Sequence, residues 1–390
     1  MPVGMYPKTI VVRTQLAASG QRRYSKKIPA SFKDTMGAAR YIWIDDSLRP
    51  ASEGVVPFVS AAVQYGFSVF EGIRCYSTDK GPAVFRMDEH VERLLDSAHI
   101  VGFRELPVTA EQVKTAINQT IAANEFAACY IRPMIYLDGA MSLTVEAGQP
   151  RFVVAVWEWK AFLGPEAKER GIRANIASFT RLHPNIMMTK AKVAGNYVSS
   201  ILAKTESQRA GFDEAIMLGP DGYVAECTGE NLFLVRNKII YTTPRAGILE
   251  GITRDSLITL ARDLGYSVVE EPISRDQLYI ADEVFVCGTA AEVVGLREID
   301  FPDRARRPRR AHARHAPQYV ACHRARGSGG AAQHAAPAAV GERQAARRRP
   351  RRVVLGHGPA AAGPRRHRLI RLSPHLALSP IDLNRCRIPP

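Results

Sequence analysis

An abrupt change of composition near residue 302 limits how much of this 390-residue chain can fold. Residues 301–390 contain 20 Arg and no Lys against three acidic residues, whereas the first 300 residues hold 33 of the 53 basic and 35 of the 38 acidic residues. The tail is rich in Ala, Pro and Gly and has no hydrophobic period. Such a segment buries too little apolar surface to offset the entropy of ordering it. We expect a folded body before the break and a disordered or frame-shifted tail at 303–390.

The charge of the tail leaves a second interpretation open, which is a basic arm that binds nucleic acid. The folded body itself is nearly neutral, so its composition does not call for a polyanionic partner, and we regard nucleic acid as an unlikely one.

The first 36 residues are predicted to be a disordered extension. Residues 1–33 carry seven Lys or Arg and no acid, a composition typical of transit peptides, and the alternative is a start upstream of Met36. No run of eighteen apolar residues predicts a membrane span. The six cysteines form no C-x-x-C pair, so neither a zinc site nor a disulfide framework is indicated. We expect a cytoplasmic protein without a metal.

Strand and helix patterns divide the body into two predicted domains of mixed α/β (α+β) class. Residues 37–158 contain strand-like runs such as CYIRPMIYL and a helix whose apolar positions from Val91 to Ala98 share one face. Residues 159–169, with Gly, Pro and several charges, are predicted to be a connector. Residues 170–302 alternate strands and helices and form the larger predicted domain. One of its predicted helices has Leu257, Leu260, Ala261 and Leu264 at helical spacing and ends at Gly265.

The segment NYVSSILA in the second domain predicts a helix that Asn196 caps. Tyr197, Val198, Ile201 and Leu202 are expected to line one face of this helix. Two lysines, at 190 and 192, lie just before this helix.

The motifs that the chain lacks point toward lysine chemistry. It has no Walker loop, no G-x-G-x-x-G, no H-E-x-x-H and no G-x-S-x-G. A lysine becomes a nucleophile when its surroundings lower its pKa from about 10.4, and it can then form a Schiff base with a carbonyl or with pyridoxal phosphate. Spacing alone leaves both Lys190 and Lys192 as candidates.

Three further segments suit a phosphorylated pyridine cofactor. EGITRD places backbone amides and a Thr hydroxyl at a helix N-terminus behind Gly251, which is a typical anion site. CGTAAE offers a second turn of amides around Thr289. CTGENLF supplies Glu230, a carboxylate that could keep a ring nitrogen protonated.

Taken together, YGFSVFEGIRCY, YIRP, KVAGNYVSS, GENLF, GITRD and GTAAE resemble, in order and spacing, the branched-chain amino acid aminotransferases, which are class IV pyridoxal-phosphate enzymes. The resemblance covers residues 41 to about 300. It implies the two-domain fold type IV architecture, pyridoxal 5'-phosphate between the domains, and at least a homodimer. It also implies ping-pong transfer of the amino group between L-Leu, L-Ile or L-Val and 2-oxoglutarate, giving branched 2-oxo acids and L-glutamate.

The resemblance assigns cofactor roles to particular residues. Lys192 matches the Schiff-base lysine, Tyr197 the residue that bonds the phenolic oxygen, and Glu230 the partner of the ring nitrogen. The phosphate site is matched by Arg93, Gly251, Ile252, Thr253 and Thr289. The helical pattern by itself predicts a solvated Arg93, because this residue lies off the apolar stripe.

It likewise implies a substrate site. Tyr130 with the amides of Thr289 and Ala290 matches the α-carboxylate site, and Arg132 the residue that receives the distal carboxylate of glutamate. The apolar wall is matched by Phe70, Gly72, Trp159 and Phe162. A neighbouring subunit is expected to contribute Tyr65, Met141 and Leu143.

Other activities share part of this pattern. A D-amino acid aminotransferase or an aminodeoxychorismate lyase would also use Lys192 and Glu230, but FEGIRCY and YIRP favour the branched-chain enzyme. A third alternative is a non-catalytic product of a disrupted gene with a basic, nucleic-acid-binding tail. The family continues after GTAAEVVGLREID with a glycine-rich turn and closing helices, where this chain has its tail, so we expect reduced solubility and activity.

Overall fold

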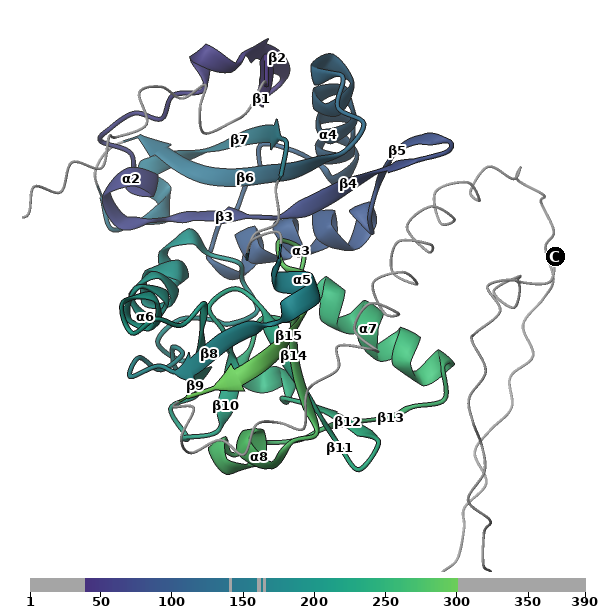
Figure 1. Ribbon diagram of the computed structural model, residues 1–390. Coiled ribbons are helices and arrows are strands. Elements are labelled where there is room, and N and C mark those ends of the chain that lie inside the picture. Colours follow the sequence, from purple (N-terminus) through teal and green to yellow (C-terminus); the bar gives the residue numbers. More distant parts are fainter. Residues whose placement is uncertain (1–38, 140–141, 160–162, 164–165, 301–390) are drawn as a thin grey trace, which may run out of the picture. The chain divides into compact units, whose positions relative to one another are not determined.

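The computed structural model describes residues 39–139, 142–159, 163 and 166–300, which form two β-sheets with helices packed on them (Figure 1). The predicted N-terminal extension and the tail lie outside the described residues. In the described part of the chain, no helix is both long and apolar enough to cross a membrane.

The first sheet has seven strands in the order β2-β1-β7-β6-β4-β5, with β3 paired to β6, and every pair is antiparallel. Its strands are β1 Tyr41–Ile44, β2 Ser47–Pro50, β3 Ser68–Phe70, β4 Ile73–Thr78, β5 Gly81–Val84, β6 Cys129–Gly139 and β7 Gly148–Trp157. The pair β6–β7 is the longest and forms the centre of the sheet. Alternating buried residues along β6 and β7 give this sheet its apolar inner face.

Two long helices bury their apolar stripes against this sheet. The helical elements here are η1 Ala51–Glu53, α2 Ala61–Tyr65, α3 Met87–Ile100, α4 Ala110–Asn124 and η2 Val145–Ala147. The predicted stripe of α3 is confirmed, because Val91, Leu94 and Ala98 are fully buried and Leu95 packs against the same core. In α4, Thr109 and Gln112 form a capping box at the start of the helix.

The second sheet has eight strands in the order β10-β9-β8-β15-β14-β11-β12-β13. The pairs β8–β9, β8–β15 and β12–β13 are parallel and the others are antiparallel. The strands are β8 Ile172–Ile176, β9 Glu214–Leu218, β10 Val224–Cys227, β11 Asn231–Arg236, β12 Ile239–Thr242, β13 Ser267–Glu270, β14 Glu283–Gly288 and β15 Glu292–Ile299. The fold is therefore α+β, as the sequence predicts.

The helical elements of this second part are α5 Ala167–Arg170, η3 Ala194–Asn196, α6 Tyr197–Arg209, η4 Arg245–Gly247, α7 Ile252–Asp263 and α8 Arg275–Ile280. Helix α7 buries Leu257, Leu260 and Ala261 as predicted, whereas Leu264 follows the last residue of the helix and is 51% exposed. Gly265, with φ 82°, comes next. The sequence pattern does not distinguish β15 as a strand of its own.

The apolar face predicted for α6 is exposed. Val198, Ile201 and Leu202 are 59%, 63% and 46% exposed, and the helix instead buries the small residues Ser200, Ala203 and Ser207. Ala203 packs in a cluster with Ala215 and Met217 of β9, a contact close enough to require small side chains. Asn196 occupies the predicted N-cap position of α6, but it has helical φ and ψ as the last residue of η3, and its side chain makes no capping bond.

Backbone hydrogen bonds join the two sheets at the segment before α6. Phe70 N–H of β3 donates to the Lys192 carbonyl at 3.1 Å, and Val69 and Val193 form an isolated antiparallel bridge. Gly195 N–H donates to the Gly66 carbonyl at 3.1 Å. The lysine segment of the second part is thereby attached to the edge of the first sheet.

We predict that Ala203→Leu lowers the free energy of unfolding by about 1–3 kcal/mol, the usual cost of overpacking a filled contact. Gln208→Leu, on the exposed face of the same helix, should change it by no more than about 0.5 kcal/mol. Urea unfolding followed by circular dichroism measures both. Equal losses in the two variants would contradict the observed orientation of α6.

Candidate active site

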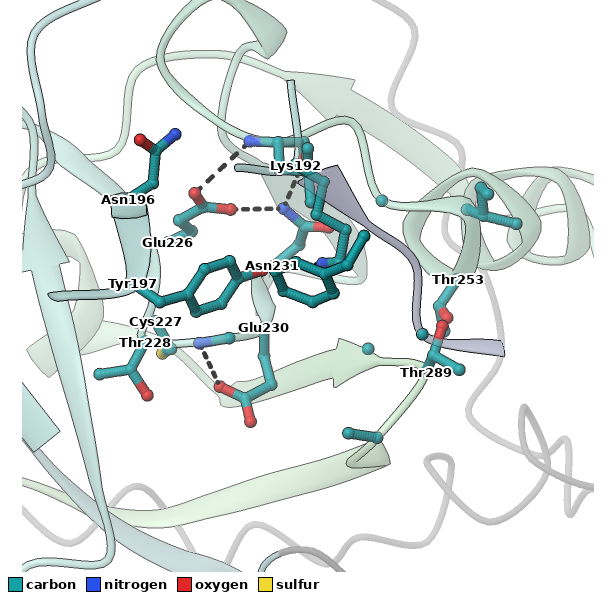
Figure 2. Close-up of a pocket in the computed structure, with 18 of the residues that line it drawn as sticks. Lys192, Asn196, Tyr197, Glu226, Cys227, Thr228, Glu230, Asn231, Thr253 and Thr289 are labelled. Carbon is teal, nitrogen blue, oxygen red and sulfur yellow. Dashed lines mark hydrogen bonds between the residues drawn. The ribbon is translucent and has the colours of Figure 1, made fainter. Parts of the chain in front are cut away.

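A cavity of about 450 Å³ lies between the two sheets (Figure 2). Its wall is drawn from β3 and the turn after it, α3 and β6 of the first part and from the η3 turn, β10, β11, the start of α7 and the end of β14 of the second. Most of the predicted site residues line it: Phe70, Gly72, Arg93, Tyr130, Arg132, Trp159, Lys192, Tyr197, Glu230, Gly251, Ile252, Thr253, Thr289 and Ala290. Residues more than 200 positions apart therefore meet in one pocket.

The amine of Lys192 lies inside this pocket. Lys192 Nζ donates to Tyr197 Oη at 2.8 Å, and lies 5.2 Å from the centre of the Phe70 ring. Its backbone is held on both sides, because Lys192 N–H donates to Ser97 Oγ of α3 at 3.0 Å while its carbonyl accepts the Phe70 amide. The amine is thus placed by the packing of both sheets.

Lys190 points elsewhere. Its amine bonds the carbonyls of Arg245 and Ile248 and lies 3.1 Å from Glu250 Oε1, and Lys190 is not part of the pocket wall. Of the two lysines that spacing leaves open, only Lys192 presents its amine to the cavity.

One end of the pocket is suited to an anion. Ile252 and Thr253 begin the twelve-residue helix α7, whose N-terminal amides and dipole favour negative charge. Thr289 follows the end of β14, and Figure 2 shows Thr253 and Thr289 toward the same end of the pocket, away from Tyr197 and Glu226. A Cβ on Gly251 would lie 2.0 Å from Asn231 Oδ1, so this helix entry requires glycine.

Arg93 adds a cation to the anion end. Its side chain is only 15% exposed, so the solvated position expected from the helical pattern is wrong. Nε and Nη2 donate to the two oxygens of Glu71 at 2.6 and 2.8 Å, and Nη1 donates to the Glu250 carbonyl at 2.7 Å. Sequence reasoning missed Glu71, although it stands inside FEGIRCY.

Glu71 is fully buried and also lies 2.7 Å from Nδ1 of buried His90. Burial acts to raise the pKa of this carboxyl, but Arg93 and His90 outweigh it and hold the pKa well below its ordinary value. Glu71 is therefore charged, and it fixes the Arg93 guanidinium in one orientation.

Two buried carboxylates line the pocket near the β10–β11 turn, and their surroundings differ. Glu226 lies 2.6 Å from Arg181 Nη2 and accepts Asn231 Nδ2 at 3.0 Å. Burial raises the pKa of Glu226, while Arg181 and Lys192 oppose the rise. The predicted residue, Glu230, accepts the Gly229 amide at 3.1 Å.

The neighbouring charge that most affects Glu230 is that of another acid, Glu214. Burial and the charge of Glu214 raise the pKa of Glu230 to about 8, and the cation that opposes this rise is Lys204 of α6. Lys204 itself pairs with Glu214. The sequence interpretation did not identify Glu226. Its charge interacts with Lys192, whereas the charges that most affect Glu230 are those of Glu214 and Lys204.

Comparison with known proteins identifies the family. The model for "Amino-transferase class IV" matches residues 68–299. The chain is 42% identical over 260 residues to a branched-chain-amino-acid aminotransferase of Pseudomonas aeruginosa, covering 66% of this chain and 84% of that protein. It is 43% identical over 269 residues to the Escherichia coli enzyme, covering 68% and 87%.

Solved structures agree. The crystal structure of the Escherichia coli branched-chain amino acid aminotransferase superposes with a TM-score of 0.66 at 43% identity, covering 67% of this chain and 87% of that one. The enzyme of Thermobaculum terrenum, solved in its PLP-bound holo-form, gives a TM-score of 0.68 at 30% identity, covering 75% and 95%. The chain belongs to the class IV aminotransferase family.

The remaining wall of this aminotransferase pocket is aromatic and cationic. Trp159 stacks on Tyr130 with ring centres 4.5 Å apart, and the Arg132 guanidinium lies 4.4 Å from the centre of the Phe70 ring. Arg132 Nη2 donates to Tyr130 Oη at 3.3 Å. Within the described residues, Arg132 Nε is buried without a hydrogen-bond partner.

Gly72 leaves space for the Tyr130 hydroxyl. A Cβ at this position would lie 2.0 Å from Tyr130 Oη. Any larger residue at position 72 would therefore displace the tyrosine.

Arg74 was also missed by the sequence interpretation. From β4, Arg74 Nε and Nη2 donate to the carbonyls of Thr289 and Ala290 at 2.8 and 2.7 Å, which fixes the turn after β14. Its position two residues after the pocket residue Gly72 in FEGIRCY is the signal that could have identified it.

Two of the residues expected from a neighbouring subunit, Tyr65 and Leu143, do not line the pocket of this chain. Tyr65 and Leu143 are 47% and 87% exposed. Met141 lies outside the described residues, as does the expected wall residue Phe162.

Proposed function

We propose that this aminotransferase transfers the amino group between branched-chain L-amino acids and 2-oxoglutarate, using pyridoxal 5'-phosphate bound at Lys192. The observation that carries the proposal is the position of the Lys192 amine, inside a pocket with an anion site at one end and a buried carboxylate elsewhere in its wall. The similarity to named branched-chain-amino-acid aminotransferases supports branched-chain amino acids as the substrate class.

The residues present fit this cofactor. Arg93, Thr253, Thr289 and the N-terminus of α7 form a donor set for a phosphate. A buried carboxylate is available for the ring nitrogen, and Tyr197 Oη for the phenolic oxygen. When bound, the cofactor supplies a carbonyl for the lysine amine and a ring that withdraws electrons from the substrate.

The protein's own groups would then bind, orient and move a proton. Lys192 Nζ would act as the base that takes the proton from the substrate Cα, with Tyr197 Oη, 2.8 Å away, orienting it. Tyr130 and the turn at Thr289–Ala290 would hold the α-carboxylate. The aromatic wall of Phe70 and Trp159 would exclude water from the reacting atoms.

The surroundings of Arg132 suit both an aliphatic and an acidic substrate side chain in the same pocket. Its guanidinium faces aromatic rings, which accept an aliphatic neighbour, and its buried Nε has no partner among the described residues. A glutamate carboxylate would supply that partner.

For the ring nitrogen, we propose Glu226 in place of Glu230. A carboxylate that keeps a pyridine nitrogen protonated must itself be ionised. The pairing of Glu226 with Arg181 favours its ionised form, whereas the pKa of about 8 keeps Glu230 mostly protonated at neutral pH.

We also propose that the enzyme is a homodimer whose contact includes α2 and α6. The exposed apolar residues of these regions are Val55, Phe58, Val59, Val63, Tyr65, Val198, Ile201 and Leu202. The bond from Gly195 to Gly66 places the end of α2 beside the start of α6, so these residues border one another. An apolar surface of this kind is typical of a subunit contact. Tyr65 and Leu143 could then complete the neighbouring pocket.

Lys192→Ala should lower transamination of L-leucine with 2-oxoglutarate by at least about 1000-fold, because it removes both the attachment point and the base. The matched variant Lys190→Ala should keep activity within about tenfold, since its amine bonds a loop outside the pocket. Coupled detection of glutamate measures both rates. D-alanine serves as the alternative donor, and its preference over L-leucine would favour the D-amino acid aminotransferase instead.

Glu226→Gln should lower kcat by at least about 100-fold, the effect typical of a lost electrostatic partner, whereas Glu230→Gln should lower it by less than about tenfold. The variants also differ in pH dependence. Because the folded state raises the pKa of Glu230 from 4.5 to about 8, it binds this proton more tightly than the unfolded chain, and stability falls as pH rises through that window.

Glu230→Gln should therefore gain melting temperature relative to the wild type as pH rises from 5 toward 8 and above. Thermal scans across this range measure the gain. A hundredfold loss of kcat in Glu230→Gln with full activity in Glu226→Gln would restore the original assignment.

The dimer proposal predicts that Val198→Glu with Leu202→Glu shifts the protein to monomer, because two charges would be buried at the contact. Gln208→Glu, which lies near the end of α6, is the matched control and should leave the oligomer intact. Sedimentation velocity measures the mass of each. An unchanged dimer in the double variant would place the contact elsewhere.

A further inference from the structure

Glu292 has an unusual backbone conformation at the turn that joins β14 to β15. It is paired with Gly288 across the hairpin and has φ 61°, in the left-handed region that favours glycine. The three residues between them, Thr289, Ala290 and Ala291, form the turn that borders the pocket. A glutamate at a position that favours glycine indicates that its side chain has a structural or functional role.

The carboxylate of Glu292 is held by two elements from outside its own sheet. The residue is 6% exposed, and its Oε1 accepts the Tyr76 hydroxyl of β4 at 3.3 Å. Oε2 forms an ion pair with Lys168 of α5, the short helix that ends the segment between the two sheets. One side chain thus joins the first sheet, the connector and the turn.

The same elements also hold the turn through its carbonyls. Arg74 of β4 bonds the carbonyls of Thr289 and Ala290, and Trp159 Nε1 of the connector donates to Ala290 at 3.4 Å. Arg74 and Tyr76 are two residues apart and so lie on one face of β4. Because the peptide unit is planar, fixing the Thr289 carbonyl also fixes the direction of the Ala290 amide.

We propose that Glu292 is a positioning residue for the substrate carboxylate, and that Lys168 and Tyr76 act through it to hold the turn at Thr289–Ala291 in its binding conformation. The connector is thereby coupled to carboxylate recognition, because its lysine must be in place for the turn to be held. This inference rests on the proposed function, in which the turn receives the α-carboxylate.

The test compares two probes of the assembled holoenzyme, one with a carboxylate and one without. 4-Methylvaleric acid is leucine without its amino group, and 3-methylbutylamine is leucine without its carboxylate. Glu292→Gln and Lys168→Met should each raise the inhibition constant of the acid by about tenfold, as expected for a hydrogen bond to a charged group. The inhibition constant of the amine and the absorbance of the bound cofactor should not change.

Further variants separate the side chain from the backbone. Glu292→Gly suits the backbone angle and removes the whole side chain, so it should weaken binding of the acid as Glu292→Gln does. Lys168→Arg should retain most of the acid binding. The double variant Glu292→Gln with Lys168→Met should be no weaker than either single variant, because the two groups act as one unit.

Glu298→Gln is the matched control. Glu298 lies on the same strand and pairs with Arg173 of β8 at 2.9 Å, and it does not line the pocket. Its inhibition constants should equal those of the wild type. An unchanged constant for the acid in Glu292→Gln, equal losses for acid and amine, or additive effects in the double variant would each overturn the proposal. A wild-type protein without transamination would contradict the proposed function instead.

Discussion

The attachment of the lysine segment to the edge of β3 is the contact on which the rest of the site depends. Lys192 belongs to the larger second part of the fold, yet its carbonyl, its amide and the neighbouring Val193 are all bonded by the first part, through Phe70, Ser97 and Val69. Neither sheet alone fixes the amine. The Lys192 amine can therefore be correctly placed only when both sheets are formed and docked.

The charged groups around that amine differ in how they are paired. Arg93 is neutralised by Glu71, which stays ionised despite its burial because Arg93 and His90 stabilise the charged form, so Arg93 contributes oriented N–H donors more than net charge to the anion end. Arg181 and Lys192 oppose the rise that burial causes in the pKa of Glu226, whereas burial and the charge of Glu214 raise the pKa of Glu230 to about 8. This difference is the basis for proposing Glu226 as the partner of the cofactor ring.

The sequence predicts the elements well where periodicity is strong, as in α3 and α7, and it fails where packing overrides pattern. Helix α6 presents Ile201 to the surface and Ala203 to the interior, because the sheet beneath it leaves space only for small side chains, and an apolar stripe cannot distinguish a core from a subunit contact. Glu71, Arg74 and Glu226 were missed for a related reason: their partners lie far away in the sequence, and only the fold brings them together.

The most direct test of this account is to reduce the purified holoenzyme with borohydride and locate the cofactor by mass spectrometry of its peptides. The account predicts a phosphopyridoxyl group on Lys192 and none on Lys190. A group on Lys190, on another side chain, or on no residue of correctly folded protein would contradict it.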